Sequence, residues 1–135
     1  INYSEDEDFP GQFELWQANC DRSLRGKKGQ AELLVLRDAL LALLVKRLLR
    51  GELYNNAGEV CAIGAYGKHK GVDLSKYDPE GCDHDRVGIE GGMPKLVAFK
   101  VVEMNDEEFY RMTPEERYTR MLAWVESMIK QEESK

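Results

Sequence analysis

The sequence has no long hydrophobic run. Its longest apolar stretch, residues 39–45, is seven residues long, whereas a membrane-spanning helix needs about 20. The first residues are acidic rather than basic, which is not the pattern of a secretory signal. We therefore expect a cytoplasmic protein without a membrane partner.

Cysteine is scarce, and basic residues are in the minority. The three cysteines, Cys20, Cys61 and Cys82, are irregularly spaced, which favours reduced thiols in a cytosol over a disulfide framework. The net charge of −6 and the pI near 5.0 argue against a nucleic-acid partner. The sequence also lacks a phosphate-binding loop and a G-x-S-x-G nucleophile motif. We expect no cofactor.

The 135 residues suffice for a single domain with one core. We expect the ends to contribute little to this core, with residues 1–8 as an acidic, partly mobile lead-in and residues 131–135 as a frayed tail. The lead-in contains four consecutive carboxylates: Glu5, Asp6, Glu7 and Asp8. This run is either a solvated segment or an acidic arm that docks on a basic partner.

The composition predicts a mostly helical α+β fold, with about four helices around a central Leu-rich helix and one small β-hairpin. The central helix is expected over residues 30–49, which are rich in Leu, Ala, Arg and Glu. Residues 39–45 are apolar on all sides, as is typical of a helix buried on most faces. Gly51 is the expected terminator of this helix. A short helix anchored by Trp16 precedes it, separated by a basic loop over residues 22–29.

The predicted hairpin lies beside the central helix. Residues 55–58 are turn formers, because Asn and Gly tolerate positive φ. Leu53 and Tyr54 would form one arm and residues 60–63 the other. Gly64, directly after the second arm, would let another backbone approach closely.

The second half of the chain is predicted to be a long connection followed by helices. Residues 67–92 are rich in glycine, with one helical turn near residues 74–77. Residues 94–104 fit a strand or a helix, and Pro94 favours the helix. Thr113 and Glu116 form a capping box before an amphipathic helix expected to end near Lys130 and to dock on the Leu-rich helix.

Two fragments are familiar in combination. The first is Gly58-Glu-Val-Cys61-Ala-Ile-Gly64-Ala, and the second is Glu103-Met-Asn105-Asp106 followed by Thr113-Pro-Glu-Glu. Together they resemble an uncharacterised group of short bacterial and bacteriophage proteins with a G-x-x-C-A-L-G-A-like turn, a W-N-D-like segment and a threonine-capped final helix. Met104 stands where that segment has tryptophan. The resemblance implies a phage or mobile-element origin and leaves the activity open.

Three groups of residues are candidates for chemistry. Cys61 is either a nucleophile activated by a helix N-terminus or by His69, or a small buried residue in a tight hairpin, which we favour. The second candidate is a cluster of four potential metal ligands: Cys82, Asp83, His84 and Asp85. The cluster lacks the usual spacing of zinc ligands. We therefore favour a polar surface loop over a metal site.

The third candidate group is Asn105, Asp106, Glu107 and Glu108. These residues fit either an acid–base or metal-binding cluster or, more simply, the end of one helix and the start of the next. In the second interpretation, the Asp106 side chain hydrogen-bonds across to the turn of residues 47–51. We favour this structural role.

These observations leave two functional hypotheses. The first is a small acidic, non-enzymatic accessory protein of phage or mobile-element origin that binds a host or phage protein, for example to inhibit a host or defence factor. The second is a small enzyme or metal-dependent module that uses Cys61, His69 and the cluster at residues 82–85. The first is favoured because no catalytic set is assembled in the sequence. The oligomeric state is left open.

Overall fold

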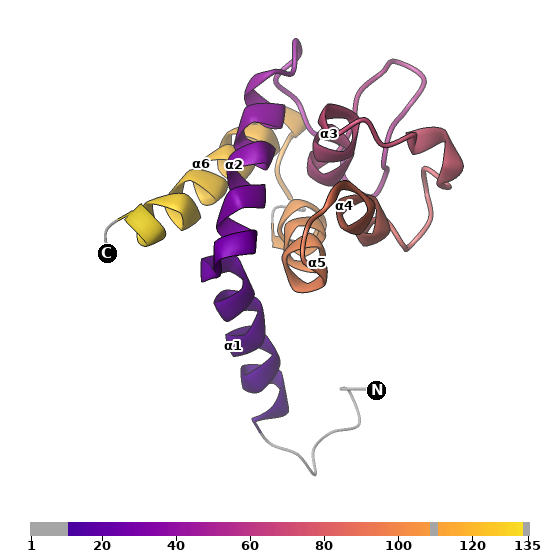
Figure 1. The fold of residues 1–135 in the computed structure, drawn as a ribbon. Coiled ribbons are helices and arrows are strands. Elements are labelled where there is room, and N and C mark those ends of the chain that lie inside the picture. The colour runs from indigo at the N-terminus through magenta and orange to yellow at the C-terminus, as the bar shows by residue number, and fades with distance from the viewer. Residues whose placement is uncertain (1–10, 109–110, 134–135) are drawn as a thin grey trace.

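The computed structural model describes residues 11–108 and 111–133, with side chains as far as Ile129 (Figure 1). The predicted acidic lead-in lies outside these residues. The described chain forms six α-helices, a 3₁₀ turn and a π-helical turn. In chain order they are α1 (Gln12–Arg25), α2 (Lys27–Leu41), α3 (Ala62–His69), η2 (Leu74–Lys76), α4 (Asp85–Gly91), α5 (Lys95–Glu103), η3 (Met104–Glu108) and α6 (Pro114–Glu133).

The predicted α+β class with a hairpin is wrong, because the described residues contain no sheet and no hairpin. One isolated antiparallel bridge joins Tyr54 and Val60, and the turn between them is closed by the Asn55 side chain, which accepts from two backbone N–H groups. The expected second arm becomes helix α3 from Ala62 onward. A helix satisfies the backbone groups of this run locally, which a two-stranded ribbon does only in part.

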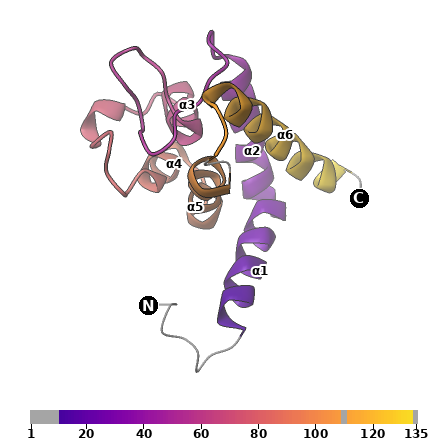
Figure 2. The ribbon, with the colours of Figure 1, turned by 180° about the vertical axis from the view of Figure 1, so that it is seen from behind.

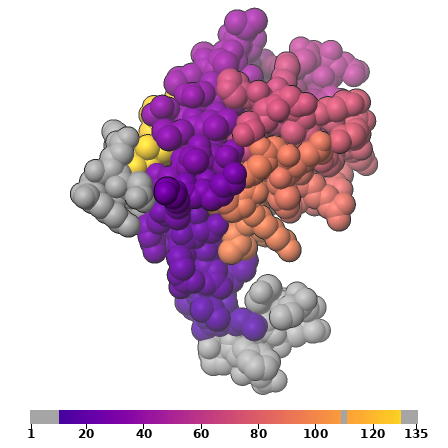
Figure 3. All heavy atoms as spheres, in the orientation of Figure 1, coloured from indigo at the N-terminus to yellow at the C-terminus, as the bar shows by residue number. Residues whose placement is uncertain are grey.

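Helices α1 and α2 follow one another with a break only at Gly26, whose backbone is extended. The predicted loop over residues 22–29 is therefore wrong: α1 is longer than expected, and the Gln30 N–H already donates to the Gly26 carbonyl. The Trp16 ring packs edge to face against Phe99 of α5, with 5.3 Å between the ring centroids. This contact agrees with the predicted role of Trp16 in anchoring the first helix. The first turns of α1 extend below the body of the molecule (Figure 3).

Helix α2 is central, as predicted, and lies between α6 and the group formed by α3, α4 and α5 (Figures 1 and 2). Helix α6 docks on it through the predicted apolar face, in which Met121 and Val125 are fully buried. The Tyr118 hydroxyl donates to the Leu40 carbonyl at 2.8 Å. The predicted capping box is confirmed: Glu116 N–H donates to Thr113 Oγ1 at 3.1 Å, and Thr113 N–H to Glu116 Oε1 at 2.9 Å.

The central helix ends at Leu41, eight residues before the predicted end. The Lys46 ammonium folds back and donates to the carbonyls of Leu41 and Leu43 at 2.7 and 2.5 Å, which caps the helix end. Residues 42–47 then form a loop at the top of the molecule (Figure 1). Gly51 does adopt positive φ, but as part of the connection and not as a helix terminator.

The glycine-rich second half is more regular than predicted. The turn at η2 is confirmed, but α4 is an unexpected helix, and residues 95–103 are helical as preferred. Gly88 explains the missed helix: a Cβ there would lie 2.8 Å from Ile63 Cδ1 and 2.9 Å from Ala98 Cβ. Glycine at this position thus allows α4 to pack closely against α3 and α5. Among the described residues, no helix is both long and apolar enough to cross a membrane.

Candidate functional site

Asn105 is a buried polar residue that joins three segments. Its Oδ1 accepts from the Ala62 N–H at 3.1 Å, at the first residue of α3. Its Nδ2 donates to the Leu49 carbonyl at 2.8 Å and to Asp106 Oδ1 at 2.7 Å. Since an unsatisfied buried amide is costly, these partners fix where α3 begins relative to the preceding loop.

Asp106 makes the contact predicted from the sequence. Its Oδ1 accepts from the Gly51 N–H at 3.1 Å, and its carbonyl accepts from Arg50 Nε at 2.9 Å. The predicted hydrogen bond between the Asp106 side chain and the turn at residues 47–51 is confirmed. We call residues 48–51 the loop root.

Arg117 was not identified from the sequence, yet it completes this polar network. Its side chain is buried, with a relative exposure of 3% for the residue, and it donates to the carbonyls of Leu48, Asn105 and Met112 at 3.0–3.1 Å. Burial and the nearby Arg50 guanidinium lower the pKa of Arg117, while Asp106 opposes this shift. The available signal was position: Arg117 precedes Met121 by four residues and so lies on the apolar face of α6.

Cys61 lies at the N-cap of α3, where its Sγ accepts from the Gly64 N–H at 3.4 Å. Gly64 is needed there, because a Cβ would lie 2.6 Å from the Leu53 carbonyl oxygen, which confirms the predicted close approach. Burial raises the pKa of Cys61 to about 12; the Gly64 N–H opposes this and the Asp106 carboxylate adds to it. Such a thiol stays protonated and is a poor nucleophile.

The other candidates for chemistry are not brought together. His69 ends α3 while Cys61 precedes its start, so about 12 Å of helix separates them. Cys82 is exposed, whereas His84 is buried with its Nε2 3.1 Å from the Asp78 carbonyl. The described residues contain no group of three or more potential metal ligands.

The acidic candidates at the start of the chain lie outside the described residues. Their predicted role as a docking arm therefore stays a prediction. They are Glu5, Asp6, Glu7 and Asp8.

A groove of about 410 Å³ lies between the loop after α2, the turn at residues 57–60 and helix α3. Its buried lining is apolar and includes Ala39, Val60 and Ala65. At its edge are residues of the loop tip, which we define as residues 41–45. Leu44 in this tip is 99% exposed, Val45 57% and Leu41 50%.

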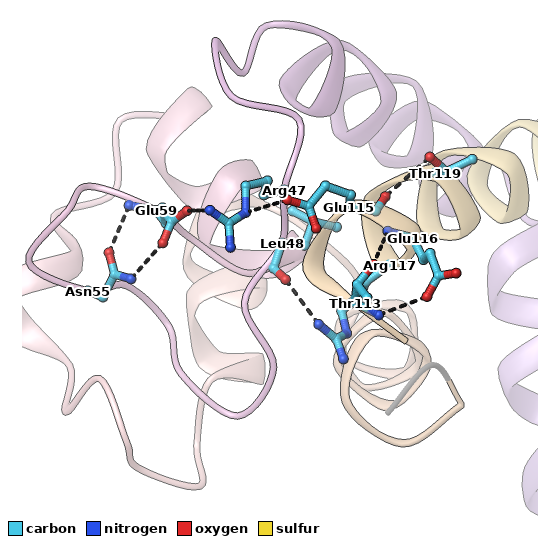
Figure 4. Close-up of polar contacts among 9 residues, drawn as sticks. All are labelled: Arg47, Leu48, Asn55, Glu59, Thr113, Glu115, Glu116, Arg117 and Thr119. Atoms are coloured by element: carbon cyan, nitrogen blue, oxygen red, sulfur yellow. Dashed lines mark hydrogen bonds and ion pairs between the residues drawn. The ribbon is translucent and has the colours of Figure 1, made fainter. Parts of the chain in front are cut away.

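An ionic bridge spans the groove wall (Figure 4). Arg47 Nη1 lies 3.2 Å from Glu59 Oε2, and Arg47 Nε lies 3.1 Å from Glu115 Oε2. The same Glu59 accepts a hydrogen bond from Asn55 Nδ2 at 2.9 Å. The loop, the turn and the start of α6 are therefore tied together around the groove, which presents a defined shape to a ligand.

We compared the chain with known proteins and found no match: no protein-family model, no curated protein and no solved structure is detectably similar to it. The resemblance to the phage protein group therefore stays a prediction. What the site does has to be argued from its own geometry.

Proposed function

We propose that this protein acts by binding another protein, and that the groove together with the loop tip is the contact surface. The observation that carries the proposal is Leu44, whose side chain is 99% exposed beside a mostly apolar groove. Burying a leucine side chain gains roughly 1.5–3 kcal/mol. A partner that covers Leu44 would recover this free energy.

Three exposed apolar residues gather in the loop tip. Leu41, Leu44 and Val45 lie within five residues of the chain and are each at least half exposed. Contiguous exposed apolar side chains beside polar residues are typical of interaction sites, whereas single ones need no explanation. In a protein interface, a few residues commonly dominate the free energy of binding.

A protein segment suits this surface better than a small molecule. The groove is large enough for a small ligand, since such sites measure roughly 300–1,000 Å³. A small ligand held in the groove, however, would leave Leu41 in water, because this half-exposed residue of the loop tip does not line the groove. A protein partner can place one side chain in the groove and cover the tip at the same time.

The resemblance described above supports a partner from a host or a phage, with this chain as an accessory protein that acts on it. Inhibition of a host or defence factor is one form that such binding takes. For the second hypothesis, an enzyme or metal-dependent module, the described residues offer no supporting arrangement, because Cys61 and His69 lie at opposite ends of α3.

The test is selection of a random-peptide display library on the wild-type protein, followed by affinity measurement with two variants. Leu44→Asp removes the apolar tip. Leu15→Asp is the matched control, since Leu15 is 59% exposed and lies on α1 at the other end of the molecule (Figure 1). We expect peptides that bind wild type and Leu15→Asp equally but bind Leu44→Asp at least about tenfold more weakly.

Two results would overturn the proposal. One is the absence of any peptide whose binding depends on Leu44. The other is a wild-type dimer, seen by sedimentation, that the Leu44→Asp substitution converts to a monomer. In that case the tip serves self-association, and no different protein is required.

A further inference from the structure

We infer that the partner segment is acidic and carries an apolar anchor, so that the anchor enters the groove and a nearby carboxylate meets Lys68 or His69. This inference rests on the proposed function, because it names the partner of the same groove.

Lys68 and His69 are exposed side chains in the last turn of α3, and both line the groove. Within the described part of the chain, neither side chain has a hydrogen bond or an ion pair. The carbonyls at this helix end are already occupied, since those of Tyr66, Gly67 and Lys68 accept from the N–H groups of residues 70–72. The Lys68 ammonium is therefore available to a ligand.

The acidic residue that lines the groove does not cancel this positive charge. Glu59 is held by Arg47 and Asn55. Asp38 precedes the lining residue Ala39 but does not itself line the groove. Its Oδ1 lies 3.7 Å from Arg37 Nε, so its charge is also paired. The groove lining thus carries a net positive charge, although the net charge of the chain is −6. Because interacting surfaces carry complementary charges, a partner segment should be negatively charged.

The apolar and cationic parts belong to one groove. The loop tip contributes the apolar side chains of Leu44 and Val45, and α3 contributes the Lys68 ammonium, with the His69 imidazole beside it in the sequence. A partner segment that fills the groove therefore needs its apolar side chain and its carboxylate close together in sequence. Short acidic–apolar peptides, rather than basic or neutral ones, meet this requirement.

The experiment uses the Leu44-dependent peptides from the display selection. The tightest of them is synthesised in two forms, one as selected and one with every Asp and Glu replaced by Asn and Gln. Binding of both forms is measured to the wild-type chain, to Lys68→Glu and to Lys95→Glu. The last variant is the matched control, because Lys95 is exposed, undergoes the same change of charge and does not line the groove.

We expect enrichment of Asp and Glu among the selected peptides and an affinity loss of about three- to tenfold in the Lys68→Glu variant, as for an exposed ion pair reversed in sign. The amide form of the peptide should lose a similar factor on wild type and little on Lys68→Glu. Binding of the acidic form should also weaken as salt is added. Lys95→Glu should bind like the wild type.

Leu44-dependent peptides that are neutral or basic, or that bind Lys68→Glu as tightly as wild type, would overturn the inference while the proposed function stands. Absence of Leu44-dependent peptides would instead overturn the proposed function itself. A synthetic peptide of residues 1–10 is a further probe, because this stretch is itself acidic and contains Tyr3 and Phe9. This peptide could bind in a Leu44-dependent way and with higher affinity than any library peptide. That result would identify a second copy of this chain as the occupant of the groove, and it would overturn the inference that the partner is a different protein.

Discussion

The loop tip and the loop root lie a few residues apart and reverse the usual distribution of polar and apolar groups. The tip is apolar and exposed, with Leu44 at 99%. The root is surrounded by polar side chains that are buried, namely Asn105 at 1% and Arg117 at 3% relative exposure. Buried polar groups and exposed apolar patches are the informative exceptions to the hydrophobic pattern.

The difference shows how a short loop can be anchored at its root and still offer an apolar surface. Nothing in the tip's own composition would keep it out of the core. The root does so, because Arg117 and Asn105 hold the carbonyls of Leu48 and Leu49 while the Leu48 side chain is fully buried. A polar network that is fully satisfied specifies one arrangement of the chain. The tip is then presented at a fixed position.

The first prediction asks whether the root is sealed from solvent, and it concerns Cys61. The pKa of its thiol is raised from 9.0 to about 12, so the thiolate fraction near pH 8 should be about a thousandfold lower than for an exposed cysteine. In the native protein a thiol reagent should modify the exposed Cys82 quickly and Cys61 only after unfolding. The measurement is reagent uptake followed by mass spectrometry of the modified peptides.

Its control is Cys82→Ser, which should abolish the fast phase.

The raised pKa of Cys61 also has a consequence for stability. The folded state binds the thiol proton more tightly than the unfolded chain. The resulting contribution to the free energy of unfolding is present below about pH 9 and is lost as the pH rises towards 12. Rapid modification of Cys61 in the folded protein would mean that the root is open, and the contrast with the tip would fail.

The second prediction removes the central donor of the root. Arg117→Met keeps much of the apolar stem but leaves the carbonyls of Leu48, Asn105 and Met112 without their guanidinium partner. We expect a loss of about 3–5 kcal/mol in the free energy of unfolding, the size typical of breaking a buried charged network. Chemical denaturation measures it. Arg120→Met, at an exposed position of the same helix, is the control and should change stability by less than about 0.5 kcal/mol.

The third prediction removes the amide that ties the root to α3. Asn105→Leu is close in volume but leaves the Ala62 N–H and the Leu49 carbonyl without a partner. We expect a loss of about 2–3 kcal/mol, because each unsatisfied buried group costs roughly 1–3 kcal/mol and the apolar side chain recovers part of it. Hydrogen exchange at Ala62 should accelerate in the variant. Unchanged stability and protection would show that Asn105 does not position α3.

The sequence was sufficient where the decisive interactions are local. The capping box at Thr113 and Glu116 joins residues three apart, and the apolar spacing of α6 predicts the face that it buries. The hydrogen bond between Asp106 and Gly51, which joins residues 55 positions apart, was also predicted, as an explanation for the pairing of the two fragments in the resemblance. The groove was not predicted, since it is formed by segments that no pattern connects.

The failures have identifiable physical causes. Residues 39–45 continue the helical composition of α2, but the chain leaves the helix at Leu41, where Lys46 caps its end. Local propensity is a weak prior that tertiary contacts override. Likewise, Gly88 in α4 disfavours a helix by itself and is accepted because α3 and α5 approach so closely there. The helix at Gly88 depends on contacts between helices that are distant in sequence, which no local pattern specifies.

The last prediction has the smallest expected effect and tests the other side of the comparison. Leu44→Asp should change the free energy of unfolding by less than about 0.5 kcal/mol, because its side chain already lies in water at 99% exposure. Leu48→Ala, four residues later at the root, should cost about 2–5 kcal/mol, since that leucine is fully buried. Chemical denaturation of both variants measures the two losses in the free energy of unfolding, which can then be compared. A loss above about 1 kcal/mol for Leu44→Asp would mean that the tip packs against the protein in solution, and the exposed leucine would then no longer support a binding surface.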